Sequence, residues 1–254
     1  MSFLPIPFDE MFGTQKAERP FKPFPSLQPF CPKAFIYASK DPVLEDRGFV
    51  SDLRMSFGNH AHNLIQQKIA NRYHCFGDWI DQAGRTFQHQ TKPQPCPMEY
   101  AETHFNIPGV GRKTKPDLLV NFDLPEGFSL LEIKCVGECP ADRPDRKHFL
   151  QANLTAYCCG MEMKVPDFFI LYIERSHPER SKWTRYPVDV ELAQLQLELM
   201  TGKIPIGICS CPGDWWCPFM EKCFTDGQSR LWSENPEISS RLEKLKWAPE
   251  ETIL

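Results

Sequence analysis

A buried strand that carries two charges is the feature that most constrains this sequence. Residues 129–134 read SLLEIK, so Glu132 and Lys134 interrupt an otherwise apolar run. Because alternate side chains of a strand share one face, the carboxylate and the ammonium point the same way. Such alternation usually marks a solvated sheet face. The strand therefore predicts either a solvated face or a polar site built on a sheet, and the neighbouring segments must decide between them.

Helix and strand patterns on both sides of this strand predict a mixed α/β domain. Helical spacing of apolar residues or helix-forming composition marks residues 54–74, 148–161 and 191–200. Strand-like runs occupy residues 99–107, 117–122, 129–134 and 167–174. The order is helix, three strands, helix, strand and helix. It predicts a mixed sheet flanked by helices.

Length and composition set the domain plan. With 254 residues, 41% of them hydrophobic, the chain can bury a substantial core. Residues 1–33 hold seven prolines and six phenylalanines, which is typical of an extended segment anchored by aromatic side chains. We expect an extended N-terminal segment over 1–25, one domain over 26–224, and a helical tail over 225–254.

Charge and hydropathy bound the partners and the location. The formal net charge of -4 provides no global attraction to nucleic acid or to an anionic membrane, so any such binding must use local patches. The apolar run at residues 168–173 is far too short to span a bilayer. The first ten residues lack a basic region and a continuous apolar stretch, so no secretory signal is visible. These features predict a cytosolic protein that does not bind membranes.

Two carboxylates on neighbouring strands predict a metal site. Asp117 stands at the head of one strand, and Glu132 follows 15 residues later on the next one. If these strands pair, the two carboxylates converge, and hard oxygen ligands of this kind suit Mg²⁺ or Mn²⁺. Lys134 beside them could orient or deprotonate a water and stabilise charge on a phosphate.

These residues carry a family resemblance. Pro116-Asp117, followed by Glu132-Ile133-Lys134, resembles the PD-(D/E)XK nuclease signature. More specifically, the chain is similar to the RecB-like branch that includes CRISPR-associated and bacteriophage exonucleases with an iron–sulfur cluster. Three further segments agree, and the similarity spans residues 26–224. They are GNHAHNLIQ at 58–66, HFLQANLTAY at 148–157 and CPFMEKC at 217–223.

The resemblance implies a restriction-endonuclease-like fold and a metal-dependent DNA exonuclease. It assigns the metal to His62, Asp117, Glu132 and the backbone carbonyl of Ile133. Lys134 would position or activate the water, and Gln151 would help to orient the water or the DNA. The implied partners are DNA ends or single strands, together with recombination or CRISPR-type proteins. The alternative is a DNA-end-binding or adaptor subunit that keeps the nuclease fold without catalysis.

The sequence departs from the family pattern at two of these positions. The family tyrosine lies four residues after the glutamine, where this chain has Thr155, and Tyr157 lies two residues further on. At about 100° per residue Thr155 shares the helix face of Gln151, whereas Tyr157 does not. A role for Tyr157 in contacting DNA is therefore doubtful. His60 competes with His62, and only the spacing from Gly58 favours His62.

Eleven cysteines form the second constellation. In a reducing compartment, cysteines act as metal ligands or buried thiols more often than as disulfides. The resemblance implies a [4Fe–4S] cluster that joins both chain ends through Cys31, Cys211, Cys217 and Cys223. Zinc could use the same four thiolates. Cys209 is the alternative to Cys211, because the usual C-x-x-C spacing would place the ligand at Asp214.

Two weaker features complete the sequence reading. Residues 74–96 contain His74, Cys75, His89 and Cys96, but their spacing fits no standard zinc site, so we interpret the stretch as a degenerate remnant of a zinc ribbon or a plain loop. Basic residues precede Asp117 and Gln151, where DNA phosphates would have to lie. They are Arg112, Lys113, Lys115, Arg143, Arg146, Lys147 and His148.

Overall fold

A computed structural model describes residues 19–20, 44–45, 49–92, 98–122, 127–141, 143–201 and 240. Two short strands, β1 (Arg19–Pro20) and β2 (Leu44–Glu45), pair with each other near the start of the chain. The four expected cluster ligands and Cys209 lie outside the described residues, and so do Cys96 and nearly all of the segments 1–25 and 225–254. The predictions for these residues stay predictions.

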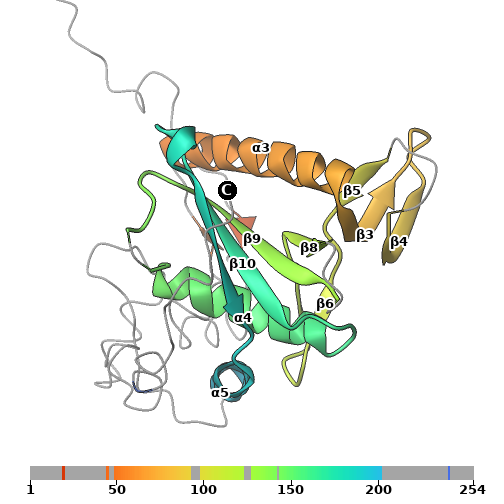
Figure 1. Ribbon diagram of the computed structural model, residues 1–254, viewed down its shortest axis with the longest axis vertical. Coiled ribbons are helices and arrows are strands. Elements are labelled where there is room, and N and C mark those ends of the chain that lie inside the picture. The colour runs from red at the N-terminus through yellow and green to blue at the C-terminus, as the bar shows by residue number, and fades with distance from the viewer. Residues whose placement is uncertain are drawn as a thin grey trace, which may run out of the picture.

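A seven-stranded mixed sheet forms the centre of the protein (Figure 1). Its path runs β11 (Lys182–Pro187), β10 (Asp167–Glu174), β9 (Ser129–Val136), β8 (Leu118–Asn121), β3 (His74–Ile80) and β4 (Thr86–Thr91), while β5 (Glu99–Ala101) also pairs with β3. β9 and β10 are parallel, and the other pairs are antiparallel. The predicted mixed α/β architecture is confirmed.

Helices pack on both faces of this sheet (Figure 1). α3 (Phe49–Arg72) covers one face, and Ala70 of this helix packs with Leu131 and Ile133 of β9. α4 (Arg146–Gly160) and α5 (Val190–Met200) lie on the other face, where their apolar residues pack with Leu130. Successive residues of β9 therefore face opposite helices. Glu132 and Lys134 alternate with Ile133, so they face the α4 side and not bulk solvent.

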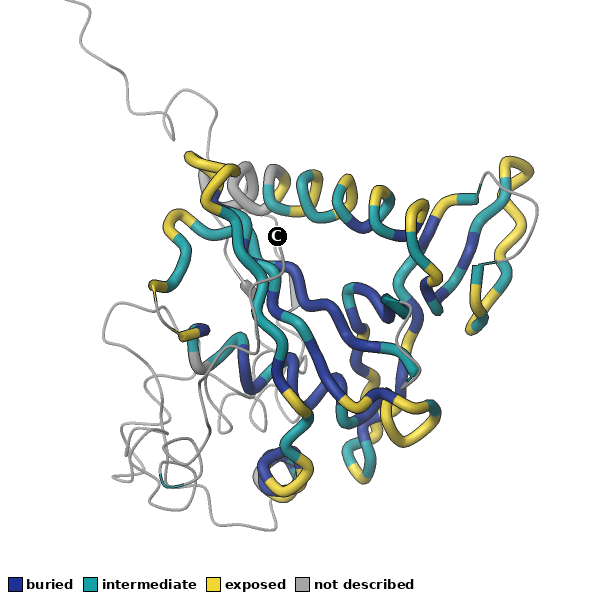
Figure 2. The backbone as a smooth tube through the Cα atoms, viewed as in Figure 1, coloured by how far each residue is buried: buried dark blue, intermediate teal, exposed yellow. Residues whose placement is uncertain are grey.

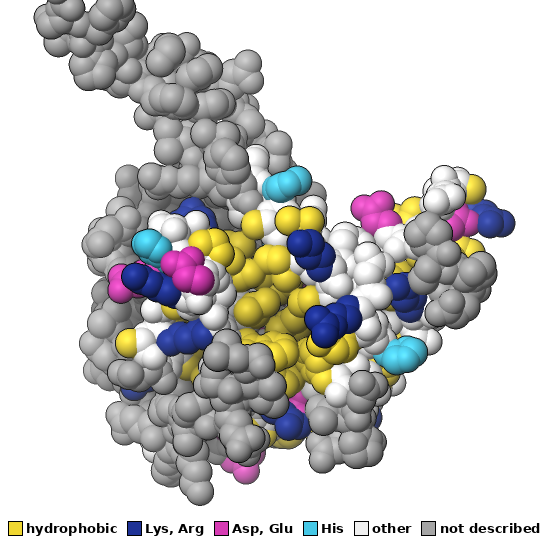
Figure 3. All heavy atoms as spheres, turned by 45° about the horizontal axis from the view of Figure 1, so that its top comes forward, with side chains coloured by type: hydrophobic (Ala, Val, Ile, Leu, Met, Phe, Trp, Pro, Cys, Tyr) yellow, Lys and Arg dark blue, Asp and Glu magenta, His cyan; other side chains and the backbone are white. Residues whose placement is uncertain are grey.

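Burial follows this layering (Figure 2). The middle strands β8, β9 and β10 are the most buried, because helices cover both of their faces. The partly buried side chains on the α3 side include Phe169, Leu171 and Trp183. Figure 3 shows one face of the molecule on which hydrophobic side chains gather, with Lys and Arg side chains around them.

Most expected elements are present at their expected positions. The strand over 167–174 has the predicted bounds, and the strand that begins at residue 129 continues to Val136. The helix expected over 54–74 runs from Phe49 to Arg72. α4 and α5 match the two other predicted helices to within two residues. No helix among the described residues is long and apolar enough to cross a membrane.

Of the two interpretations of residues 74–96, the plain loop is wrong, and the degenerate remnant stays a prediction. Residues 74–80 form β3, which lies inside the sheet between β8 and β4, and the turn at Asp81–Arg85 leads into β4. Cys75, Gly77 and Trp79 alternate as buried positions along β3. Gly77 is required here, because a Cβ atom would lie 2.3 Å from the ring of Tyr100 on β5.

The single strand expected over 99–107 is also wrong. The chain forms β5 over Glu99–Ala101 and then a separate strand, β6 (Phe105–Ile107), which pairs with β7 (Arg112–Thr114) in a two-stranded ribbon. The break falls at Glu102, whose side chain bonds to Gln66 and Lys115. β5 therefore ends at the residue before Glu102, whose side chain bonds to α3 and to Lys115.

Candidate metal and catalytic site

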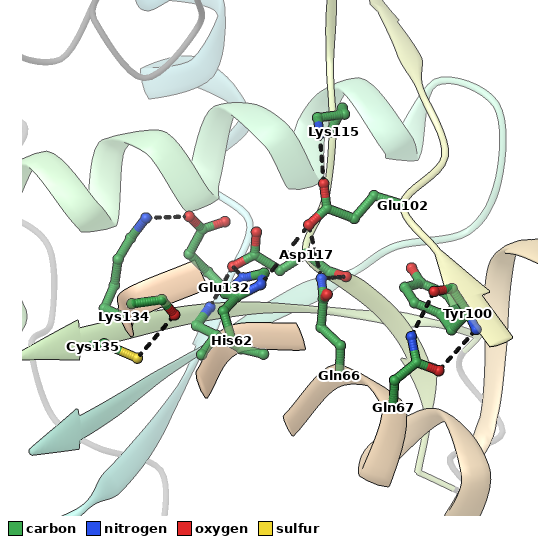
Figure 4. Close-up of polar contacts among 12 residues, drawn as sticks. His62, Gln66, Gln67, Tyr100, Glu102, Lys115, Asp117, Glu132, Lys134 and Cys135 are labelled. Carbon is green, nitrogen blue, oxygen red and sulfur yellow. Dashed lines mark hydrogen bonds and ion pairs between the residues drawn. The ribbon is translucent and has the colours of Figure 1, made fainter. Parts of the chain in front are cut away.

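Polar side chains from four parts of the chain lie in or beside an open cleft (Figure 4), and α4 adds a fifth part. α3 contributes His62, the end of β5 contributes Glu102, and the start of β8 contributes Asp117. β9 adds Glu132 and Lys134, and α4 adds Gln151. The cleft has a volume of about 700 Å³. Its lining consists of Gly58, Asn59, His62, Asn63, Glu102, Lys115, Asp117, Ile133, Lys134 and Cys135.

Asp117 lies at the centre of the site. The pairing of Leu118 with Leu131 puts Asp117 next to the Glu132–Ile133 segment of β9. Asp117 Oδ2 accepts a hydrogen bond from the backbone N–H of Ile133 at 2.6 Å and lies 3.0 Å from His62 Nε2. His60 is exposed, whereas the His62 side chain is only 19% exposed and faces Asp117. Of the two candidate histidines, His62 is the one brought into the cleft.

Glu132, Lys134 and Gln151 form a closed triangle of hydrogen bonds. Glu132 Oε1 accepts from Lys134 Nζ at 2.6 Å and from Gln151 Nε2 at 2.7 Å, and Lys134 Nζ also donates to Gln151 Oε1 at 3.2 Å. The Glu132 side chain is only 1% exposed. Its second oxygen, Oε2, is buried without a hydrogen-bond partner among the described residues. This oxygen is therefore available to a ligand.

The electrostatics of the site favour bound protons when it holds no cation. Burial, followed by the Asp117 charge, raises the pKa of Glu132 to about 7, although Lys134 opposes the shift. Burial alone would lower the pKa of Lys134, but the Glu132 and Asp117 carboxylates outweigh it and raise that pKa. Burial likewise opposes the rise in the pKa of His62, and the hydrogen bond and charge of Asp117 outweigh it. A cation bound by Glu132 and His62 would replace their protons, because metal ligands bind deprotonated.

Glu102 belongs to the site, and the sequence reading missed it. Its carboxylate accepts from Gln66 Nε2 at 2.8 Å and from Lys115 Nζ at 2.7 Å. The sequence contains only an indirect signal for Glu102. Gln66, which bonds to Glu102, follows His62 by four residues, so Gln66 and His62 lie on the same face of a helix. Glu102 itself stood inside a run that was assigned to a single strand. Its polar role only becomes visible once that run is broken.

The donor set fits a hard divalent cation. One ligand atom each from His62, Glu102 and Asp117 can be chosen so that all three lie within 4.8 Å of one another. The unpartnered Oε2 of Glu132 adds a buried carboxylate oxygen next to Asp117. Carboxylate oxygens with one imidazole nitrogen, open on one side to solvent, suit Mg²⁺ or Mn²⁺.

Cys75 and His89, from the weaker group over residues 74–96, do not come together. Cys75 packs on the α3 side of the sheet, where burial raises its pKa to about 12, and it is therefore a neutral thiol. His89 packs against Phe76 and Phe105 on the other side and contacts Glu162. A zinc site that joins Cys75 and His89 is therefore not formed.

Thr155, at the position of the family tyrosine, and His148, one of the basic residues before Gln151, both make polar contacts with other parts of the fold. Thr155 is buried, and its hydroxyl lies 3.0 Å from that of Thr114. His148 lies 3.0 Å from the Tyr172 hydroxyl, with Nδ1 facing it. Among the basic residues, Arg112 and Lys113 are exposed, and Lys115 pairs with Glu102.

Comparisons with known proteins add little to this geometry. No family model and no curated protein matches the chain. One similar solved structure is the crystal structure of SSO0001, with a TM-score of 0.41 and 12% sequence identity. The alignment covers 85% of this chain and 91% of that chain. A likeness at this level does not support an argument about fold or function.

Proposed function

We propose that the protein is a metal-dependent deoxyribonuclease of the RecB-like PD-(D/E)XK type, built on a restriction-endonuclease-like sheet. One observation carries the proposal. Asp117 and Glu132 meet across the paired strands β8 and β9, next to His62 and Lys134, in an open cleft. The order of these residues along the chain agrees with the signature that the sequence resembles.

The cation would be held by His62, Asp117, Glu132 and the backbone carbonyl of Ile133. When bound, it would stabilise negative charge on a phosphate and make a water more acidic. Lys134 donates to Glu132 and has a raised pKa, so its ammonium is the charged group that would hold a water or a phosphate oxygen. Gln151 contacts both Glu132 and Lys134, and its role is to fix their orientation.

The substrate would be DNA, attacked from an end. Lys115 lines the cleft, and the exposed Arg112 and Lys113 precede it along the chain, so positive charge is available locally although the protein is acidic overall. The alternative, a DNA-end-binding subunit without catalysis, would use the same surface. The two functions differ in whether bound DNA is cut.

The test is incubation of the full chain with end-labelled linear DNA and closed circular DNA, with Mn²⁺ or with EDTA. We expect loss of linear DNA only, and only with Mn²⁺. Asp117→Asn should abolish cleavage, whereas Glu99→Gln, at the exposed other end of β5, should not. Binding of linear DNA without cleavage by the wild-type protein would leave the adaptor function.

The cluster is proposed from the family resemblance and the cysteine pattern that agrees with it. Cys31, Cys211, Cys217 and Cys223 would hold [4Fe–4S], with zinc as the second possibility. Iron, zinc and acid-labile sulfide analysis of anaerobically purified protein distinguishes the two. Cys31→Ser should lose the metal and stability together, because metal binding contributes folding free energy. Cys211→Ser should be more severe than Cys209→Ser.

A further inference from the structure

We propose that Glu102 is a direct ligand of the divalent cation, and that Lys115 occupies its carboxylate until the cation takes that place. The inference rests on the proposed function for the presence of a cation in this cleft. It adds a ligand that the resemblance does not supply, and it gives Lys115 two successive partners.

The geometry of the carboxylates supports the assignment. Glu102, Asp117 and His62 are the three described residues whose ligand atoms lie within 4.8 Å of one another. Glu132 does not belong to that group, so its carboxylate oxygens lie farther from at least one of the three residues, and its Oε1 accepts from Lys134 and Gln151. In Figure 4, Asp117 lies between Glu132 and Glu102. A cation bound to Asp117 on the His62 side therefore has Glu102 within reach.

Gln66 holds Glu102 in this position. The Gln66 side chain is 3% exposed, and its Nε2 donates both to Glu102 Oε1 at 2.8 Å and to the backbone carbonyl of Asp117 at 2.7 Å. One buried amide thus ties the Glu102 carboxylate to the segment that carries Asp117. A partner that fixes a carboxylate in this way is typical of the residues around a metal site.

A second observation points to a ligand at the same site. Glu132 Oε2 is buried and unpartnered among the described residues, and it belongs to a carboxylate that interacts electrostatically with both Asp117 and His62. A buried polar oxygen of this kind costs free energy unless something binds it. A cation bound to Asp117 would be a partner of the right charge for this oxygen.

Lys115 differs from Lys134 in how easily its ion pair with glutamate can be broken. Its side chain is 50% exposed, and it donates to Glu102 Oε2 at 2.7 Å. An exposed ion pair contributes little, so a cation can displace this ammonium at small cost. The released ammonium stays at the mouth of the cleft, where a DNA phosphate would lie.

The rival explanation is that Glu102 orients His62 and never touches the cation. Carboxylates often accept the second N–H of a metal-bound histidine. Here His62 Nδ1 is 4.0 Å from Glu102 Oε1, which is too long for a hydrogen bond. The nearest donors to Glu102 are Gln66 and Lys115 instead.

Titration of the metal-free full chain with Mn²⁺ by calorimetry, without DNA, tests the proposal. Glu102→Gln should weaken binding by about tenfold or more. Lys115→Met should strengthen it by about two- to fivefold, the equivalent of one half-exposed ion pair. Glu99→Gln and Lys113→Met remove the same charges from exposed positions and should stay within about twofold of wild type. In the Glu102→Gln background, Lys115→Met should lose its effect.

A crystal structure of the wild-type chain with Mn²⁺ separates the direct ligand from the rival. A Glu102 oxygen about 2.1 Å from the ion supports the proposal. Mn²⁺ bound to Asp117 while Glu102 still pairs with Lys115, or an unchanged affinity in Glu102→Gln, overturns it and leaves the nuclease proposal standing. Absence of any Mn²⁺ binding overturns both. Glu102-dependent binding without DNA cleavage supports this inference and overturns the proposed function.

Discussion

Two glutamate–lysine pairs flank Asp117, and they differ in how far each is removed from water. In the Glu132–Lys134 pair the side chains are 1% and 20% exposed, and Gln151 bonds to both. In the Glu102–Lys115 pair they are 22% and 50% exposed. The same two chemical groups therefore occur once as a fixed part of the protein interior and once as a contact that water can replace.

This difference shows how one site can keep one ion pair fixed and let the other exchange its partner. Breaking a buried pair leaves an uncompensated charge in a poorly solvated place, so both partners must stay. An exposed pair is weak and can be replaced by a stronger ligand. The inner pair is thus suited to positioning reacting groups, and the outer pair to admitting a cation and then a phosphate.

The largest expected contrast between the pairs is in DNA cleavage. Lys134→Met should reduce kcat/KM on end-labelled linear DNA by about 10²–10⁴-fold, because a positioned group that holds the water is lost. Lys115→Met should reduce it by about tenfold or less, because a half-exposed phosphate contact contributes mainly to binding. Equal losses in the two variants would contradict the division of roles.

The next contrast is in stability, measured by urea unfolding of the metal-free protein. Lys134→Met should cost about 3 kcal/mol near pH 8, because Glu132 must then stay charged and unpaired or bind a proton. Lys115→Met should cost less than about 1 kcal/mol. The double variant Glu132→Gln with Lys134→Met should recover most of the loss, since no unpaired charge remains. A Lys134→Met protein as stable as Lys115→Met would show that the inner pair is not effectively buried.

The inner pair was predictable from sequence, and the outer pair was not. Glu132 and Lys134 lie in a strand with strong alternation, and Asp117 precedes a second apolar run, so the pairing of β8 with β9 followed from local patterns. Glu102 depends on where a strand ends. The run over 99–107 has no glycine or proline to mark its break, and the break follows from tertiary bonds to Gln66 and Lys115.

The strand β3 was missed for a related reason. Its alternation uses Cys75, Gly77 and Trp79, and glycine is depleted in strands when judged by propensity alone. Gly77 is present because the ring of Tyr100 occupies the space of a side chain. That requirement comes from a neighbouring strand and cannot be read from the segment itself. The nearby cysteines and histidines are residue types typical of metal ligands, although Cys75 is a core residue.

The charge of the inner pair also acts on His148. Burial, and then the Lys134 ammonium, lower the pKa of His148 to about 4 from its usual 6.5. The unfolded chain therefore binds this proton at a higher pH than the native protein does. The stabilising effect of neutral His148 is complete above about pH 6.5 and is lost as the pH falls towards 4.

As the pH falls from about 6.5 to about 4.5, the free energy of unfolding of the wild type should decrease by about 2 kcal/mol more than that of His148→Asn. Asparagine can keep the contact with the Tyr172 hydroxyl, so the comparison isolates the charge. Urea unfolding at the two pH values provides the measurement. His177→Asn, at an exposed position, should behave like wild type. Parallel pH profiles for His148→Asn and wild type would contradict the assignment.

The smallest expected effect concerns the second partner of Lys115. If its ammonium moves from Glu102 to a DNA phosphate, one counterion is released when DNA binds. Lys115→Met should then lower the slope of log K against log salt by about 0.7 to 0.9, measured with Ca²⁺ in place of Mn²⁺ so that DNA is bound but not cut. Lys164→Met, an exposed lysine that does not line the cleft, should leave the slope unchanged.

In EDTA, where Lys115 remains paired with Glu102, the slope of the wild type should fall towards that of Lys115→Met. A slope that does not depend on the cation would mean that Lys115 never changes partner, and the outer pair would then be as fixed as the inner one.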